Sequence, residues 1–82
     1  MADILKTIRD EGGRAGITRI LYGANLSYDR LTRYLKELSE AKLLREMEES
    51  GKTIFVLTER GYEFLKEYRR IKEFAEAFGI KI

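Results

Sequence analysis

The spacing of apolar residues changes twice along this chain, and those two changes limit the folds it can adopt. Up to Leu38 the apolar residues recur every three or four positions, as on one face of a helix. From Leu43 to Leu57 they form two short runs around a turn, and from Phe64 the helical spacing returns. The pattern therefore predicts helices, then a β-hairpin, then a last helix, within the 82 residues of one domain.

Two helices of unequal length are predicted at the start of the chain. The first begins after Asp3, whose carboxylate is a suitable N-cap, and it ends near Glu11, before two consecutive glycines. Residues 14–16 are expected to be a short connection. A brief second helix covers residues 17–22, and its buried side carries Ile17, Ile20 and Leu21.

The third helix has the clearest start signal. Residues 23–25 break the chain as a tight turn, and Ser27 follows as the N-cap. Asp29 stands in the first turn, where a carboxylate suits the helix dipole. We expect this helix to fade around Lys42, and its core-facing stripe consists of Tyr28, Leu31, Leu35 and Leu38.

A β-hairpin is predicted directly after the third helix. Residues 43–47 alternate loosely between apolar and charged side chains, and residues 48–52 supply a turn. Residues 53–57 are rich in β-branched and aromatic side chains. These two runs predict a hairpin of two strands.

The last helix carries an apolar seam with heptad spacing. Thr58 is its candidate N-cap, Gly79 is its expected end, and Tyr62 and Leu65 lie off the seam, where they can dock the helix onto the domain. A bare seam would expose a large apolar strip, which monomers rarely do, so we expect a homodimer. Packing of the seam on the chain's own core is the alternative. The seam consists of Phe64, Tyr68, Ile71, Ala75 and Phe78.

This order of elements is that of a winged helix-turn-helix with one added helix. The predicted fold class is mainly α, of the α+β type, with three helices, a two-stranded wing and a C-terminal dimerisation helix. Residues 1–58 form the predicted winged helix-turn-helix domain. Residues 59–82 form the C-terminal helix, a candidate coiled coil.

The exposed side of the third helix is the first candidate for binding nucleic acid, because in a helix-turn-helix it enters the major groove of DNA. Arg30 and Arg33 can present forked donors to guanine, and Lys36 can neutralise a phosphate. Ser27 and Tyr28 can bind a phosphate at the helix N-terminus. The alternative is a solvated helix face whose cations pair with neighbouring carboxylates.

Three further cations are candidates for phosphate contacts. Lys52 lies at the tip of the predicted wing, although three glutamates crowd the preceding strand, and a hairpin that only caps the core is the alternative. Arg14 and Arg19 flank the start of the second helix, which in this fold crosses the DNA backbone. A role in solubility alone is the other interpretation of these two arginines.

Composition argues against several classes of function. The chain has no cysteine and no histidine, so we predict no zinc site, no other metal site and no cofactor. Nothing in it assembles a catalytic site, so neither an enzyme nor a small-molecule substrate is expected. With a net charge of only +2, a DNA-binding surface must gather its cations on one face.

The same composition suggests where such a protein works. The sequence shows no signal peptide and no apolar span, so we expect a cytoplasmic, nucleoid-associated protein without a membrane partner. Abundant charged residues, a single asparagine and no glutamine hint at a thermophilic source.

The chain resembles a family of archaeal winged-helix DNA-binding proteins, the Sulfolobus ten-a chromatin protein type. The resemblance is carried by the break at Gly12-Gly13, by residues 17–38 (ITRILYGANLSYDRLTRYLKEL) and by residues 55–74 (FVLTERGYEFLKEYRRIKEF). It implies binding of double-stranded DNA and a homodimer made by antiparallel pairing of the last helices. The chain departs from the family in two ways: Lys42 stands where such proteins usually carry glycine, and the last helix is short.

Binding of double-stranded DNA, by a transcriptional regulator or a chromatin protein, is therefore the predicted function. The third helix has no asparagine or glutamine to read adenine, which favours low sequence specificity. The alternative is a winged helix used for protein contacts without nucleic acid, which the near-neutral charge and the acidic wing strand favour.

Overall fold

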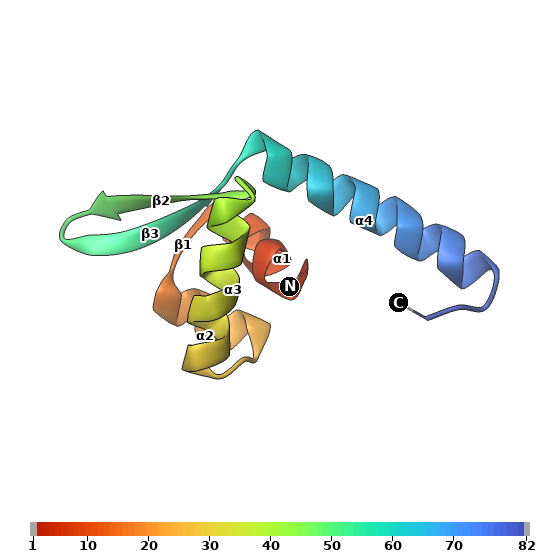
Figure 1. Cartoon of the computed structure of the whole chain (residues 1–82), viewed down its shortest axis with the longest axis horizontal. Helices are drawn as coiled ribbons and strands as arrows, with labels where there is room; N and C mark the ends of the chain where they lie inside the picture. Colours follow the sequence, from red (N-terminus) through yellow and green to blue (C-terminus); the bar gives the residue numbers. More distant parts are fainter. Residues whose placement is uncertain (1, 82) are drawn as a thin grey trace.

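The structure, a computed structural model, describes residues 2–81 and shows four helices and three strands within them (Figure 1). The predicted order of three helices, a hairpin and a last helix is confirmed. In chain order the elements are α1 (Ala2–Asp10), β1 (Arg14–Gly16), α2 (Ile17–Ala24), α3 (Tyr28–Glu40), β2 (Leu44–Glu49), β3 (Lys52–Leu57) and α4 (Glu59–Ala77).

The hydrophobic core lies where the first three helices meet the sheet. Leu31, Leu35 and Leu38 of α3 are buried, as their spacing predicts. Tyr28 was expected on the same stripe, but it is 58% exposed. It is the first residue of α3, beyond the edge of the core, and its ring faces the groove described below. The fully buried side chains of the core are Ile4, Leu5, Ile8, Ile20 and Leu31.

The turn between α2 and α3 has the expected local signals. Asn25 ends α2 in the left-handed conformation with φ 54°, which asparagine tolerates better than most residues. Ser27 caps α3, and its hydroxyl accepts a hydrogen bond from the Arg30 backbone N–H at 3.4 Å. The turn therefore fixes the direction in which α3 leaves α2.

The sheet has three antiparallel strands in the order β1-β3-β2, whereas the sequence predicted a two-stranded wing. Residues 14–16, expected to be a connection, form β1, in which Ala15 lies opposite Phe55 of β3. The Leu57 N–H also donates to the Gly13 carbonyl at 2.8 Å. A segment of three residues is too short to show the alternation of a strand. Its pairing with β3, which makes it a strand, could therefore not be predicted from the sequence. The β2–β3 hairpin extends beyond this pairing as the wing (Figure 1).

Lys42 ends α3 in the place where glycine is usual. Its φ is 64°, and the Leu43 N–H donates to the Leu38 carbonyl while the Lys42 N–H donates to the Ser39 carbonyl. These two bonds are the Schellman pattern, in which the left-handed residue follows the C-cap. The helix therefore stops at Glu40 although a non-glycine residue occupies the left-handed position.

A single residue, Thr58, joins β3 to α4. Its hydroxyl accepts from the Gly61 N–H at 3.0 Å and so caps α4, as predicted. The same hydroxyl lies 2.7 Å from the Lys42 carbonyl and 3.0 Å from the Leu43 carbonyl, which it reaches as donor. Thr58 therefore ties the end of α3, the sheet and α4 together.

The helix α4 leaves the body as a rod and is anchored mainly through its first half (Figure 1). Gly61 and Leu65 are buried there, so docking by Leu65 is confirmed, while Tyr62 is 45% exposed. The helix ends before Gly79, whose φ of 76° closes another Schellman turn, as the sequence predicted. No helix within residues 2–81 has both the length and the apolar character that crossing a bilayer requires.

Candidate nucleic-acid interface

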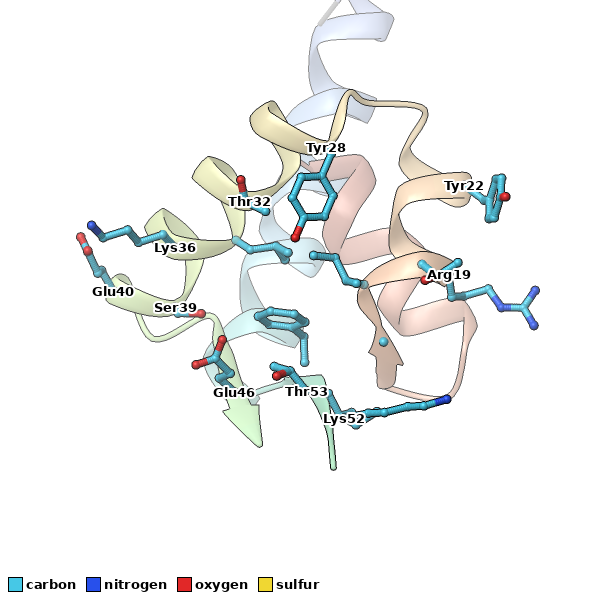
Figure 2. A pocket seen from close by; sticks show the side chains of 16 residues that line it. Arg19, Tyr22, Tyr28, Thr32, Lys36, Ser39, Glu40, Glu46, Lys52 and Thr53 are labelled. Atoms are coloured by element: carbon cyan, nitrogen blue, oxygen red, sulfur yellow. The ribbon is translucent and has the colours of Figure 1, made fainter. Parts of the chain in front are cut away.

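A groove of about 1160 Å³ separates α2 and α3 from the wing (Figure 2). Its floor is apolar, with Leu35 of α3 and Phe55 of β3, both nearly buried. Its rims carry Arg19 of α2, Lys36 of α3 and Lys52 of β3. The turn after α2 and the cap of α3 set the position of α3 relative to α2 on one wall of this groove.

Half of the residues predicted to bind DNA line this groove. Arg19, Tyr28, Lys36 and Lys52 come together there from three elements that are distant in sequence. In Figure 2 the Tyr28 ring points into the groove, whereas Lys36 and Arg19 extend outward from opposite sides. The other four predicted residues lie outside its lining: Arg14, Ser27, Arg30 and Arg33.

The two arginines near the start of α2 are held by carboxylates of the chain. Arg14 forms an ion pair with Glu49 across the sheet, and Arg19 pairs with Glu11 at 3.0 Å. All four side chains are more than a third exposed. Exposed pairs of this kind contribute about 0–1 kcal/mol, so a phosphate can displace the carboxylate at little cost.

The outward side of α3 carries unpaired cations. Within residues 2–81, neither Arg33 nor Lys36 forms an ion pair, and both are exposed. They lie three positions apart and therefore share one side of the helix. Asp29 and Glu40 lie on the same side and lower its positive charge.

Arg30 lies at the far edge of that side, about 60° from Arg33 but about 120° from Lys36. It precedes the groove residue Thr32 by two positions, and at about 100° per residue this places it nearly opposite Thr32. Its side chain is exposed on the flank that faces away from the wing. Arg30 can therefore reach a phosphate beside the helix more readily than a base next to Thr32.

The wing contributes one cation among several carboxylates. Lys52 lines the groove, and its register partner on β2 is Glu49, the residue that pairs with Arg14. Glu46 of β2 also lines the groove. The inner side of the wing is therefore close to neutral, and Lys52 is its positive group.

Hydroxyl groups on the groove wall were missed by the sequence analysis. Thr32 and Ser39 of α3 and Thr53 of β3 all line the groove. The Ser39 hydroxyl oxygen is buried and has no hydrogen-bond partner among the described residues. No composition signal marks these positions, because serine and threonine are common on helices and strands, and only the position of the wing shows which of them face the groove.

The apolar face of α4 is rotated from the predicted seam. Ala75 is only 8% exposed, and Tyr68 is half-buried, with the Lys6 ammonium of α1 over its ring, 5.1 Å from the ring centroid. Phe74, which the seam omitted, is 69% exposed, and its ring centroid lies 5.1 Å from that of Phe78. The exposed apolar face, as the structure has it, consists of Phe64, Ile71, Phe74 and Phe78.

Comparison with known proteins identifies the fold and the family. A family model described as winged helix-turn-helix matches residues 1–76. A search among curated proteins gave no match.

Three solved structures resemble this chain over most of its length. One is Sso10a-2, a DNA-binding protein from Sulfolobus solfataricus, with 26% identity and a TM-score of 0.72 over 95% of this chain and 85% of that one. Another is F93 from STIV, a winged-helix DNA-binding protein, with 26% identity and a TM-score of 0.74 over 85% and 83% of the two chains.

The third, BpsR of Bordetella bronchiseptica, whose DNA binding is regulated by 6-hydroxynicotinic acid, is 20% identical, with a TM-score of 0.75. The match covers 80% of this chain and 48% of BpsR, and at this identity it shows the fold alone. The resemblance to archaeal winged-helix proteins that the sequence indicated is confirmed by the Sulfolobus and STIV structures. With four helices and a three-stranded sheet among residues 2–81, and with a family match over residues 1–76, this chain belongs to the winged helix-turn-helix family.

Proposed function

We propose that this protein binds double-stranded DNA without catalysis, with α3 in the major groove and the wing beside the neighbouring backbone. One observation carries the proposal: Lys36 and Lys52 border the groove between α3 and the wing, Arg33 lies beside Lys36 on the outward side of α3, and all three are exposed without a carboxylate partner among the described residues. Backbone phosphates supply most of the affinity of such proteins, so clustered unpaired cations are the feature that matters. The DNA-binding activity of Sso10a-2 and F93 supports the same function.

The residues have distinct proposed roles. Arg33 reaches base edges and Lys36 a phosphate from the outward side of α3, and Arg30 contacts the backbone on the far flank. Ser27 and Tyr28 place backbone N–H and hydroxyl groups at the N-terminus of α3, where a phosphate is favoured. Arg19 of α2, Arg14 of β1 and Lys52 of the wing contact further phosphates. On binding DNA, each of the two arginines leaves its carboxylate partner in the free protein and pairs with a phosphate.

We also propose that the protein acts as a homodimer joined through α4. The exposed face of Phe64, Ile71, Phe74 and Phe78 would be covered by the same face of a second copy. Monomers rarely leave a continuous apolar strip of aromatic side chains in water. An antiparallel pair of helices, as the family resemblance implies, would place the two α3 helices at the ends of one rod.

Duplex affinity measured against salt concentration tests the DNA proposal. If Arg14, Arg19, Arg30, Lys36 and Lys52 each neutralise one phosphate, the log–log slope is about −4.5 for one protomer and about −9 for a dimer. Arg33→Ala should weaken binding to a fluorescent 30-base-pair duplex of mixed sequence, whereas Lys66→Ala on α4, also exposed, is the matched control and should not.

A winged helix that contacts only proteins is the second candidate function. The acidic residues of β2 favour it, because Glu46 and Glu48 are exposed and would repel a phosphate backbone. An affinity for duplex that is negligible, or that does not change with salt, would favour this candidate and contradict the DNA proposal.

Whether the role is that of a specific regulator or of a chromatin protein depends on how much base readout exists. We propose low specificity, because α3 carries no asparagine or glutamine. A chromatin protein should lose a labelled duplex to unrelated competitor DNA at moderate salt, whereas a regulator should keep its site.

A further inference from the structure

Thr32 presents a methyl group to the groove because its hydroxyl is already used. The Thr32 Oγ1 donates to the Asp29 carbonyl at 3.0 Å, which holds the hydroxyl against the preceding turn of α3. Thr32 lines the groove and is partly exposed. With the hydroxyl fixed along the helix, the methyl group is what remains for a molecule that lies beside α3.

The surroundings of this methyl group are apolar. The Tyr28 ring, one turn before Thr32, points into the groove in Figure 2. Leu35, one turn after, is 3% exposed and forms the floor. Together Tyr28, Thr32 and Leu35 form an apolar strip along the wing side of α3, while Arg33 and Lys36 lie on the outward side.

In the major groove of DNA, one apolar group of the bases can contact this strip, the 5-methyl group of thymine. Each of the four bases has its own pattern of groups there, and thymine alone carries a 5-methyl group. The methyl group of threonine is one of the side-chain groups that contact it. The first half of a recognition helix, where Thr32 lies, is the part that reaches base edges.

We propose that Thr32, with the Tyr28 ring beside it, contacts the 5-methyl group of thymine and gives this protein a preference for A·T pairs in the major groove. The proposal rests on the proposed function, since it requires α3 to enter that groove. It assigns to Thr32 a specificity role that requires neither asparagine nor glutamine.

Replacing thymine by uracil tests the proposal without knowledge of a target site, because uracil lacks only the methyl group. Affinity is measured for a duplex of alternating adenine and thymine and for the same duplex with uracil throughout. The full chain should prefer the thymine duplex at least about fourfold, the factor expected when one methyl group is removed from water.

Two variants, one without the methyl group and one nearly isosteric without the hydroxyl, separate the contributions of these two groups. Thr32→Ser keeps the hydroxyl and loses the methyl, so its preference for thymine should fall below about twofold. Thr32→Val keeps a methyl and loses the hydroxyl, so its preference should persist. Circular dichroism spectra that match the parent chain verify that both variants fold.

Each possible outcome decides the proposal. Equal affinity of the parent chain for the two duplexes, or a preference that survives in Thr32→Ser, would overturn it while leaving DNA binding intact. Loss of the preference in Thr32→Val would assign the readout to the hydroxyl and would also overturn it. No salt-dependent binding to either duplex would overturn the proposed function and this inference together.

Discussion

At Gly61, α4 packs closely on the rest of the domain, and replacing this glycine with alanine should weaken that attachment. A Cβ atom at this position would lie 2.4 Å from the Leu43 carbonyl oxygen and 2.5 Å from the Leu57 Cδ1. Neither neighbour can move freely. The Leu43 carbonyl accepts hydrogen bonds from both the N–H and the hydroxyl of Thr58, and Leu57 is 5% exposed in the core.

The expected loss follows from two opposing effects. Alanine is favoured over glycine in a helix by at most about 1 kcal/mol, and less in the first turn, where residue 61 lies. Forcing an extra carbon into a well-packed site costs about 1–3 kcal/mol, and the upper end applies because one obstacle is backbone. We therefore expect Gly61→Ala to lower the free energy of unfolding by about 2 kcal/mol, which corresponds to a fall in Tm of roughly 8–16 °C.

Urea unfolding followed by far-ultraviolet circular dichroism, at one fixed protein concentration, measures this loss. Glu63→Ala is the matched control, because it introduces alanine at an exposed position two residues later in α4. That variant should stay within about 0.5 kcal/mol of the parent chain. A Gly61→Ala protein as stable as the parent, or more stable, would refute the reasoning, since it would show that α4 does not pack this closely on the Leu43 carbonyl.

Three other predictions concern the end of α3, the apolar face of α4 and the cations. Lys42→Gly should raise the free energy of unfolding by about 1 kcal/mol, because glycine adopts φ 64° without strain; a loss in the same urea titration would contradict the Schellman assignment. Ile71→Glu should convert a dimer to a monomer in sedimentation velocity, whereas Lys66→Glu, on another side of α4, should not; equal behaviour of the two would reject the proposed interface. Lys36→Ala should make the salt slope of duplex binding shallower by about 0.9 per protomer, and an unchanged slope would remove that residue from the interface.

Sequence patterns predicted the features that depend on residues nearby in the chain. They missed the features that depend on pairing with residues distant in the chain. The cap at Ser27 and the leucine stripe of α3 depend on neighbours within a few residues, so both were predicted correctly. The strand β1 has only three residues, and its one buried side chain, Ala15, is a strand residue because Phe55 lies opposite. No local pattern contains that pairing.

In the candidate site, too, local features were predicted and features that depend on distant residues were not. Spacing placed Arg33 and Lys36 on the exposed side of α3, but it could not show that the wing makes a groove wall of Thr32 and Ser39. On α4, the spacing of apolar residues predicted a seam. Which apolar side chains of α4 are exposed depends on the packing of α4 against α1, which the spacing does not show. The α1 helix partly covers Tyr68, and the exposed face shifts toward Phe74 as a result.

The direct junction at Thr58 has a consequence for how two DNA-contacting units would be spaced. One residue separates β3 from α4, and its hydroxyl bridges α4 to the two carbonyls that end α3. Because no further residue can absorb a change in angle at this junction, we expect a tilt of the wing to carry α4 with it. In a dimer built on α4, a tilt of the wing against the backbone would change the distance between the two recognition helices, and the length of DNA spanned would be governed at this threonine.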